Sequence, residues 1–298
     1  MTCLVSVVIP AFNAERWIAD TLRSVVAQTY PDIEVVVVDD GSTDGTEKVV
    51  RSFGRAVRYV RQENAGVSRA RNRGFEEARG ELIAFLDADD EWLPEKIGTQ
   101  VQRILARPEV VVSFTDCIYV DQSTNAEVFR MRCRLEPDLV AGLLLHSCIV
   151  GNASTVMVRR TAFERVGGFD PAFSQCADWD MWIRLAGLGS VDIVSEPLAR
   201  YRIIPGSMSR SSTLLEKDTL GVLEKFFARP EQASRYGPMR DRIYSNQYLI
   251  LSGTHLHAGH LGASLRCLGL AALRRPAALL RAFGLPARAL ARLLGGRP

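Results

Sequence analysis

The sequence has no acidic residue after Asp241, although Asp and Glu number 34 in the whole chain. The basic residues beyond that point are all arginines: Arg242, Arg266, Arg274, Arg275, Arg281, Arg288, Arg292 and Arg297. Because the net charge of the 298 residues is only +3, the part of the chain before this stretch is net negative. A basic end of this kind favours contact with an anionic membrane surface, and the alternative is a solvated helical face.

Metal-binding and disulfide spacings are also missing. The six cysteines form no C-x-x-C pair and indicate neither a zinc site nor a disulfide framework: Cys3, Cys117, Cys133, Cys148, Cys176 and Cys267. A reducing cytoplasm suits such cysteines best. The four histidines show no metal-binding spacing, and we expect His255, His257 and His260 to lie on the surface.

Signals for membrane insertion and for phosphate loops are lacking as well. The apolar residues 4–9 are too few for a signal peptide, and no apolar run reaches membrane-spanning length. No Gly-x-x-x-x-Gly-Lys occurs, so there is no P-loop, and the lack of Gly-x-Gly-x-x-Gly argues against a dinucleotide fold. A hydrophobic content of 47% still supports a real core, in one large or two modest domains.

Strand and helix patterns alternate over the first hundred residues. The predicted strands are residues 5–10, 33–38, 57–61 and 82–86. The predicted helices are residues 13–28, capped by Asn13, and residues 42–53, 67–78 and 94–106. Repeated β-α units predict an α/β fold with a Rossmann-like, mainly parallel sheet flanked by helices.

The pattern changes from Val110 onward. Further strands are predicted at residues 110–120, 155–159 and 198–203, and a helix at residues 178–188. Polar hairpin-like sequence and an apolar helix separate the first two of these strands. Residues from about Thr213 to the end are predicted to be mostly helical.

Two acidic clusters directly follow predicted strands. One is residues 39–44 and the other is residues 87–90. Ligands in open α/β sheets bind outside the carboxyl ends of the strands, so both clusters should face one crevice. Carboxylates this close repel one another unless a cation or a donor-rich ligand joins them. A divalent metal that carries a nucleotide diphosphate would do both.

Seven segments, taken together, carry a family resemblance. They are VSVVIPAFN at residues 5–13, DDGSTD at 39–44, GVSRARN at 66–72, DADD at 87–90, GGFD at 167–170, DWDMWIRL at 178–185 and YR at 201–202. In this order and at these spacings they resemble family 2 glycosyltransferases of the GT-A fold, over roughly residues 4–210.

The resemblance implies residues that read the nucleotide base. Asp40 would accept the imide N–H of a uracil or thymine ring, and the alternative is an Asx turn that caps the helix at Ser42. Pro10 and Phe12 would lie beside the base, although plain core-edge residues would look the same.

The resemblance also implies a metal and phosphate site. Asp89 would ligate Mg²⁺ or Mn²⁺, and Asp87 would contact the ribose or a metal-bound water. Asp90 is expected to cap the following turn instead. Arg71 would meet the phosphates or pair with Asp40 or Asp87.

A general base and a lid are implied further along the chain. Asp178 would take the proton of the acceptor hydroxyl, and the alternative is a helix N-cap. Ala177 stands where the family usually has Glu, which leaves the contact of that Glu with the acceptor in doubt. Ile204 replaces a frequent His in the lid, so Arg202 or Arg210 would supply its charge.

These features predict an inverting, metal-dependent glycosyltransferase. It would move a sugar from a UDP- or dTDP-linked donor to an acceptor hydroxyl, in the assembly of cell-surface polysaccharide or glycolipid. The expected partners are a nucleotide-sugar donor and a carbohydrate or lipid-linked acceptor, and no nucleic acid. The expected location is the cytoplasm, with peripheral contact between the Arg-rich C-terminus and the inner face of the plasma membrane.

We expect residues 1–210 to form the catalytic domain, with a nucleotide-binding half at 1–109 and an acceptor-binding half at 110–210. Residues 211–298 would be a helical C-terminal extension. The competing functions are a nucleotidyltransferase, which would more often begin with a basic glycine-rich loop, and a non-catalytic sugar-nucleotide-binding protein.

Overall fold

The computed structural model describes residues 3–146, 151–204 and 211–277. The chain forms two compact units, one of residues 1–143 with 148–207 and the other of residues 144–147 with 208–298. Among the described helices, none is both long enough and apolar enough to cross a membrane.

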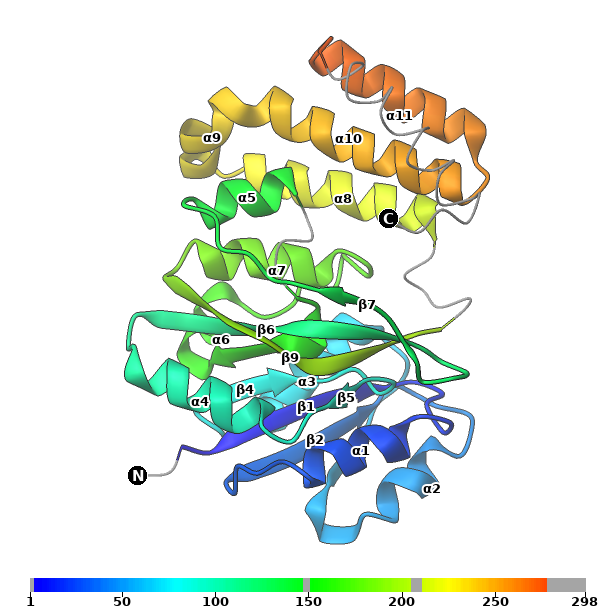
Figure 1. Ribbon diagram of the computed structural model, residues 1–298, viewed down its shortest axis with the longest axis vertical. Helices are drawn as coiled ribbons and strands as arrows, with labels where there is room; N and C mark the ends of the chain where they lie inside the picture. Colours follow the sequence, from blue (N-terminus) through cyan, green and yellow to red (C-terminus); the bar gives the residue numbers. More distant parts are fainter. Residues whose placement is uncertain (1–2, 147–150, 205–210, 278–298) are drawn as a thin grey trace. The chain divides into compact units, whose positions relative to one another are not determined.

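The first unit is built on one nine-stranded mixed sheet (Figure 1). Its strands are β1 (Val5–Ala11), β2 (Ile33–Asp39), β3 (Arg58–Arg61), β4 (Leu82–Phe85), β5 (Glu91–Trp92), β6 (Val110–Asp121), β7 (Glu127–Met131), β8 (Val156–Arg159) and β9 (Ser190–Ile203). The order is β3-β2-β1-β4-β8-β6-β9-β5, and β7 pairs with β6. Strands β3, β2, β1 and β4 pair in parallel, so their carboxyl ends meet at one edge.

Helices cover both faces of this sheet. They are α1 (Ile18–Val26), α2 (Thr46–Arg51), α3 (Val67–Glu77), α4 (Lys96–Ala106), α5 (Leu139–Leu145), which runs into the second unit, α6 (Arg160–Val166) and α7 (Ala177–Ala186), with short 3-10 turns η1 (Gly54–Ala56) and η2 (Ala153–Thr155). The predicted α/β fold is therefore confirmed.

Alternation along the strands decides which helix packs on which face. One core joins residues such as Val7 and Ile9 of β1 to apolar side chains of α1, α2 and α4. On the other face, Val36 and Val38 of β2 pack against Ala70 of α3. Successive strand residues point to opposite faces, and both faces are buried, which is why β1 and β2 read as continuous apolar runs.

The second unit is helical in its described part. Its helices are α8 (Ser212–Phe227), α9 (Pro230–Tyr236), α10 (Arg240–His257) and α11 (Leu261–Arg274), with the 3-10 turn η4 (Gly237–Met239). Gly259, at a φ of 78°, takes the left-handed turn between α10 and α11. His257 and His260 are exposed as predicted, but His255 is buried, so its predicted surface position is wrong. It lies on the inner face of α10, where helix packing covers it.

Two other local predictions differ from the structure. Helix α1 begins at Ile18 and has no side-chain cap, because the side chain of Asn13 bonds to Thr43 instead. Strand β9 begins at Ser190, eight residues before the predicted start. Its pairing with β6 shifts register around Asp116, which pairs with Pro197, and such an irregularity accommodates a proline inside a strand.

A close approach of helix α3 to the sheet gives the first testable prediction. A Cβ atom on Gly74 of α3 would collide with Val8 and crowd Val38, whereas one on Gly98 of α4 would meet nothing closer than Thr29 Oγ1 at 4.0 Å. We expect Gly74→Ala to lower the free energy of unfolding by about 1–3 kcal/mol through overpacking. Gly98→Ala, the matched control, should raise it by roughly 0.5–1 kcal/mol. Urea denaturation of both variants measures the difference, and equal effects would show that α3 does not need this contact.

Candidate active site

The acidic residues predicted from the sequence lie at the carboxyl ends of neighbouring strands. Asp39 ends β2, and the next residue is Asp40. Asp87 comes two residues after the end of β4. Since β1 lies between β2 and β4 and runs parallel to both, these carboxylates share one edge of the sheet.

Arg71 joins two of the predicted site residues. Its Nη1 donates to Asp178 Oδ1 and its Nη2 donates to Asp87 Oδ1, both at 2.7 Å. The guanidinium also lies 5.1 Å from the ring centre of Phe169, and the arginine is only 4% exposed. Burial by itself would lower the pKa of Arg71, but the charges of Asp178 and Asp87 outweigh it and raise the pKa. The arginine therefore stays charged and holds α3, α7 and the end of β4 together.

Asp178 lies in the first turn of α7 but does not cap that helix. The cap residue is Cys176, and no side-chain bond caps the helix start. The carboxylate of Asp178 instead accepts from Arg71 and from the backbone N–H of Ala153 at 3.1 Å. Burial raises the pKa of Asp178, Arg71 opposes the shift, and Asp87 adds to it. Its side chain remains 25% exposed, so a molecule outside can reach this partly desolvated carboxylate.

Asp89 carries the clearest electrostatic signature of the site. Burial, reinforced by the charge of Asp87, raises the pKa of Asp89 to about 6. Within the residues that the structure describes, no other residue donates a hydrogen bond to its carboxylate. A carboxylate in this condition is unfavourable alone and is stabilised by a cation.

Asp90 has a structural role, and Ser154 mediates it. Ser154 Oγ accepts from the backbone N–H of Asp87 at 3.1 Å and lies 2.5 Å from Asp90 Oδ2. The backbone N–H of Arg202 donates to Asp90 Oδ1 at 3.0 Å. Burial, with the charges of Asp89 and Asp87, raises the pKa of Asp90 far above its usual value. This carboxyl group fixes the shape of the acidic loop rather than facing a ligand.

Arg202 is bound to the same loop. Its Nε donates to the backbone oxygen of Asp89 at 3.1 Å, and its Nη2 pairs with Glu91. The guanidinium lies 4.5 Å from the ring centre of Trp17. The other lid residue predicted from the sequence, Arg210, lies outside the described residues.

Asp40 orders the loop that leads into α3. Its Oδ1 accepts from Gln62 Nε2 at 2.7 Å and from the backbone N–H of Ala65 at 2.8 Å, and its Oδ2 accepts from the N–H of Gly66 at 2.8 Å. An ionised carboxylate offers about four acceptor sites, so about one remains for a ligand. Arg71 does not pair with Asp40. The carboxylate partners of Arg71 are Asp87 and Asp178.

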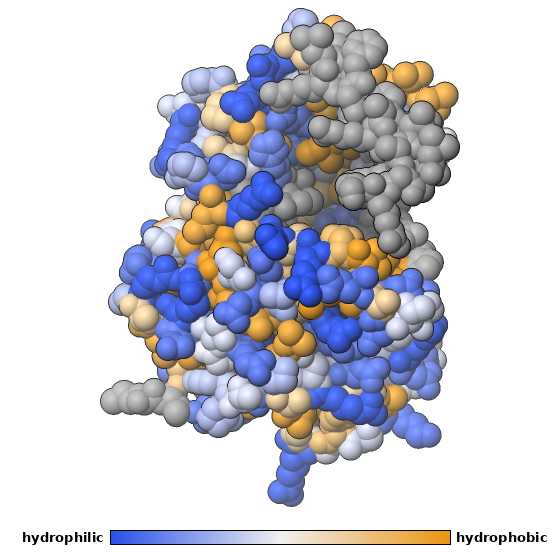
Figure 2. Space-filling view, in the orientation of Figure 1, coloured by the Kyte–Doolittle hydropathy of each residue, from blue (hydrophilic) through white to orange (hydrophobic). Residues whose placement is uncertain are grey.

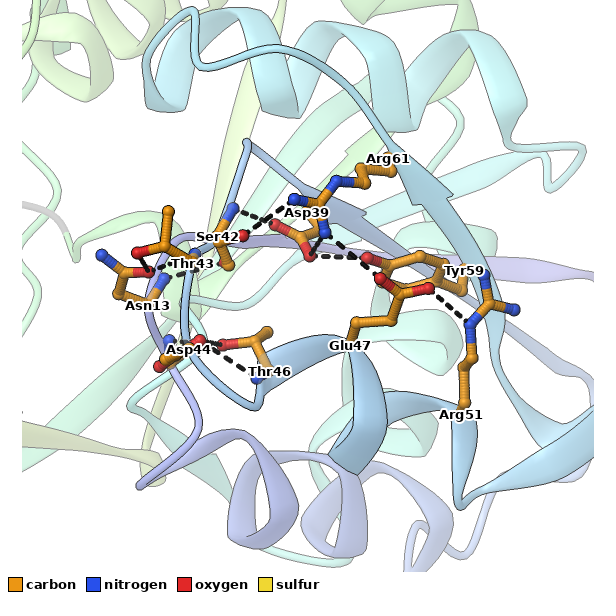
Figure 3. A network of polar contacts seen from close by, with 11 residues as sticks. Asn13, Asp39, Ser42, Thr43, Asp44, Thr46, Glu47, Arg51, Tyr59 and Arg61 are labelled. Atoms are coloured by element: carbon orange, nitrogen blue, oxygen red, sulfur yellow. Dashed lines mark hydrogen bonds and ion pairs between the residues drawn. The ribbon is translucent and has the colours of Figure 1, made fainter.

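Asp39, rather than Asp40, makes the turn at Ser42 (Figure 3). Asp39 Oδ1 accepts from the backbone N–H of Ser42 at 2.7 Å, and Oδ2 accepts from Tyr59 Oη at 2.6 Å. Burial and this bond raise the pKa of Tyr59 to about 12. Arg61 completes the network with a contact of 3.5 Å to Asp39. Asp39 is fully buried and structural.

Side-chain and backbone bonds tie the loop after β1 to the loop after β2. The N–H of Asn13 donates to Ser42 Oγ and that of Thr43 donates to Asn13 Oδ1, both at 2.9 Å (Figure 3). The N–H of Ala14 donates to Thr46 Oγ1 at 2.8 Å. Within this frame Pro10 is buried in β1, opposite Val38, while Phe12 is 52% exposed. Phe12 is thus accessible to a flat ligand, and Pro10 is part of the sheet.

The donor set at the end of β4 suits a hard divalent cation. Asp87 and Asp89 supply only oxygen, and hard ions such as Mg²⁺ and Mn²⁺ prefer oxygen ligands. Mutual repulsion contributes to the raised pKa of Asp89, and a cation would relieve it. The residues present therefore fit such a metal.

Sequence reasoning missed two contributors, Ser154 and the N–H of Ala153. Both belong to η2, and Ser154 lies 64 residues along the chain from Asp90 of the acidic loop that it supports. No local pattern in the sequence marks them, because their role depends on the antiparallel pairing of β8 with β4.

Comparison with known proteins agrees with this arrangement. The model of the family "Glycosyl transferase family 2" matches residues 6–167, more than half of the chain. The chain belongs to glycosyl transferase family 2. The family predicted from the sequence motifs is confirmed.

Two curated relatives show how far the similarity extends. An uncharacterized glycosyltransferase of Rickettsia typhi is 32% identical over 208 residues, which cover 67% of this chain and 64% of that protein. The putative teichuronic acid biosynthesis glycosyltransferase TuaG of Bacillus subtilis is 32% identical over 223 residues, 72% of this chain and 85% of its own. The chain thus spans a little under two thirds of the Rickettsia relative.

Solved structures share the fold. The mannosyltransferase PcManGT from Pyrobaculum calidifontis, in complex with GDP-Man and Mn²⁺, superposes with a TM-score of 0.64 at 22% identity, over 98% of this chain and 81% of its own. S. aureus TarS 1-349 in complex with UDP-GlcNAc superposes with a TM-score of 0.63 at 16% identity, over 92% of each chain. The predicted GT-A fold is confirmed.

Ser154 gives the second testable prediction. Ser154→Ala leaves the N–H of Asp87 without its acceptor and removes a partner of buried Asp90, so we expect a loss of about 1–3 kcal/mol of stability. Ser123→Ala, in the exposed turn between β6 and β7, is the matched control and should change stability much less. Thermal unfolding of the two variants makes the comparison. Similar losses would mean that the acidic loop does not depend on Ser154.

Proposed function

We propose that the protein is an inverting glycosyltransferase that moves a sugar from a nucleotide-diphosphate sugar to an acceptor hydroxyl. One observation carries the proposal: buried Arg71 binds Asp87, at the end of β4, and Asp178, at the start of α7, with 2.7 Å contacts. Through this bridge Asp87, which is suited to hold the donor, and Asp178, which is suited to act as a base, bind the same guanidinium.

The donor is assigned to the edge formed by β1, β2 and β4. UDP- and dTDP-linked sugars are the preferred donors, because Asp40 retains an acceptor site for an imide N–H and Phe12 offers an exposed ring. TarS, which shares the fold, has been solved with UDP-GlcNAc. In this assignment residues 1–109 form the nucleotide-binding half of a catalytic domain that ends near residue 210.

Metal dependence rests on the acidic loop. Asp89 would ligate Mg²⁺ or Mn²⁺, and Asp87 would hold a metal-bound water or the ribose. The bound cation would neutralise charge on the diphosphate leaving group. PcManGT, another protein of this fold, has been solved with Mn²⁺. Arg202 keeps the backbone of this loop in place, and it and Arg210 are the residues assigned to the lid.

Asp178 is assigned as the general base. As the acceptor oxygen bonds to the anomeric carbon, its proton passes to the Asp178 carboxylate, and the bond from that carbon to the diphosphate breaks. A single displacement of this kind inverts the configuration. The partly desolvated carboxylate is a stronger base than a solvated one, while the charge of Arg71 favours the ionised form and its hydrogen bond orients the carboxylate.

The acceptor is assigned to residues 110–210, which include Asp178. A carbohydrate or a lipid-linked sugar in cell-surface polysaccharide or glycolipid assembly is the preferred class, and the name of the relative TuaG supports it. A nucleotidyltransferase would instead release pyrophosphate from a nucleoside triphosphate. A non-catalytic binding protein would bind donors without hydrolysing them or transferring their sugar. Assays of pyrophosphate release and of donor hydrolysis therefore separate the alternatives.

The third prediction concerns the base. Asp178→Asn should reduce turnover by about 10²–10⁴-fold, because an amide cannot take the hydroxyl proton. Donor affinity should change little, and thermal unfolding checks that the fold survives. Asp20→Asn, an exposed acidic residue on α1, is the control that should retain full activity. Wild-type turnover in Asp178→Asn would exclude this residue as the base.

The fourth prediction concerns metal and pH. Since the pKa of Asp89 is raised to about 6, a proton competes with the cation below that value and not above it. Mn²⁺ affinity should therefore be constant at neutral pH and about tenfold weaker one unit below this pKa. Calorimetry with nucleoside diphosphates, with Mn²⁺ or with EDTA, measures it across pH. If nucleotide affinity is the same with Mn²⁺ and with EDTA, the metal is removed from the proposal. The same follows if Asp89→Ala binds nucleotide and Mn²⁺ as tightly as the unmodified protein.

Peripheral contact with an anionic membrane is assigned to the C-terminal helices. On α11, Leu261, Leu265 and Leu273 are each more than half exposed, and Figure 2 shows apolar surface over this helix. Exposed leucines beside arginines suit the surface of a bilayer. Of the arginines there, Arg266 and Arg274 are paired with acidic residues, so the leucines are assigned the larger share of the contact. Residues 278–298 lie outside the described part.

The fifth prediction tests this contact by flotation with anionic liposomes at low salt. The full chain should float with the liposomes. Replacing two exposed leucines together, Leu261→Gln with Leu265→Gln, should reduce the fraction of protein that binds the liposomes. Leu135→Gln, an equally exposed leucine of the first unit, is the control and should float like the unmodified chain. Full-length protein that stays with the unbound fraction would rule out the membrane contact.

A further inference from the structure

The helical unit contains a buried cluster of three side chains with metal-binding atoms. They are Glu216 of α8, His255 of α10 and Cys267 of α11. One carboxylate oxygen, one imidazole nitrogen and the cysteine Sγ lie within 4.8 Å of one another. Their exposed fractions are 8%, 1% and 0%. Such burial is unusual for a glutamate, which is almost never found inside a protein without a partner.

Existing bonds already point these side chains at one another. Glu216 Oε2 accepts from Arg266 Nη2 and lies within hydrogen-bonding distance of His255 Nε2, each at 2.7 Å. The remaining imidazole nitrogen, His255 Nδ1, is buried and has no hydrogen-bond partner among the described residues. Buried polar atoms are nearly always satisfied, so this imidazole has a nitrogen that is still available to a further partner.

The three candidate ligand atoms indicate which kind of ion would bind. Carboxylate oxygen, imidazole nitrogen and thiolate sulfur together are the ligands of Zn²⁺ and related transition metals. Mg²⁺ and Ca²⁺ prefer oxygen alone, as at Asp87 and Asp89. We propose that Glu216, His255 and Cys267 form a second metal site, for a zinc-class ion, separate from the catalytic site of the first unit.

The charges of the cluster suit a divalent ion. With the thiol deprotonated, Cys267 and Glu216 together balance two positive charges, and Arg266 can keep its bond to Glu216. Cysteine binds a metal ion as the thiolate, so a bound ion would displace the thiol proton. Three protein ligands leave one tetrahedral position, which water would fill.

The site would cross-link the helical unit. Its ligands come from α8, α10 and α11. The last two helices follow each other through the turn at Gly259 and also bond directly, as between Ser252 and Ser264. An ion that binds the folded unit and not the unfolded chain stabilises the fold by mass action. The proposed role is therefore structural, and it does not depend on the reaction of the first unit.

The bland alternative is a polar cluster that contains no metal. In that case Glu216 would pair with Arg266 and bond to His255, His255 Nδ1 would stay without a partner, and Cys267 would be a small core residue. The two cases differ in one measurable property, the formation of a metal–sulfur bond.

Cobalt(II) is the probe that reports this bond. The full-length protein, reduced and stripped of metal, is titrated with Co²⁺ in the presence of excess Mg²⁺ to occupy oxygen-only sites. We expect one equivalent of Co²⁺ to give a thiolate-to-cobalt charge-transfer band in the near ultraviolet, together with intense tetrahedral visible bands. Zn²⁺ should displace the Co²⁺ and raise the unfolding temperature.

Three variants locate the signal. Cys267→Ser should abolish the charge-transfer band, and Glu216→Gln should weaken Co²⁺ binding by at least the roughly 10–100-fold that loss of a supporting residue typically costs. Cys133→Ser, the same change in the first unit, is the matched control and should leave the band intact. Circular dichroism confirms that each variant is folded.

The full-length protein alone can overturn the proposal, whatever the variants do. Absence of a thiolate band on Co²⁺ titration would show that the cluster is the metal-free network. A band that persists in Cys267→Ser and disappears in Cys133→Ser would place the bound metal elsewhere. Neither result bears on glycosyl transfer, which is assayed separately with the donor and Mn²⁺.

Discussion

The buried guanidinium of Arg71 is the constraint on which the site depends. Two carboxylates, from the end of β4 and the start of α7, lie close enough to repel each other unless a cation stands between them. Removing a buried charge partner typically costs about 3–5 kcal/mol, because the charge left behind is uncompensated. Arg71 is thus part of the fold as much as of the site, and the aromatic ring of Phe169 fixes its position.

The carboxyl groups in the acidic loop after β4 have different contacts. Asp87 pairs with Arg71, Asp90 turns inward to Ser154 and the backbone of β9, and Asp89 keeps a carboxylate that no other described residue engages. Three aspartates within four residues would be costly if all were charged in one environment. Burial and the charges of Asp89 and Asp87 raise the pKa of Asp90, so charge is disfavoured on this inner group.

Sequence patterns predicted the alternation of strands and helices because both faces of β1, β2 and β4 are covered, which makes long apolar runs. They also placed Asp40, Asp87 and Asp89 near one sheet edge, since strand ends are visible in sequence, whereas the role of Asp178 was implied only by the family resemblance. They did not predict that Arg71 would pair with Asp178, 107 residues away. Ser154, buried His255 and the long strand β9 were missed for the same reason, because tertiary neighbours decide their roles.

Asp39 and Asp40 illustrate the limit more finely. The sequence offered two adjacent carboxylates and two roles, an Asx turn and a ligand contact. The structure assigns the turn to Asp39, through the N–H of Ser42, and gives Asp40 the loop before α3. Adjacent residues in an extended segment point to opposite sides. The roles of Asp39 and Asp40 therefore depend on which side of the strand each one faces, and the sequence does not reveal this.

The bonds between the loops after β1 and β2 have a consequence for rigidity. Neither loop is held mainly by its own residues, because amides of one bond to side chains of the other. Their conformational entropy is therefore lost during folding rather than on ligand binding, and the exposed ring of Phe12 projects from a surface that is already ordered. It follows that the two loops should open together, and their amides should exchange with solvent as one cooperative group.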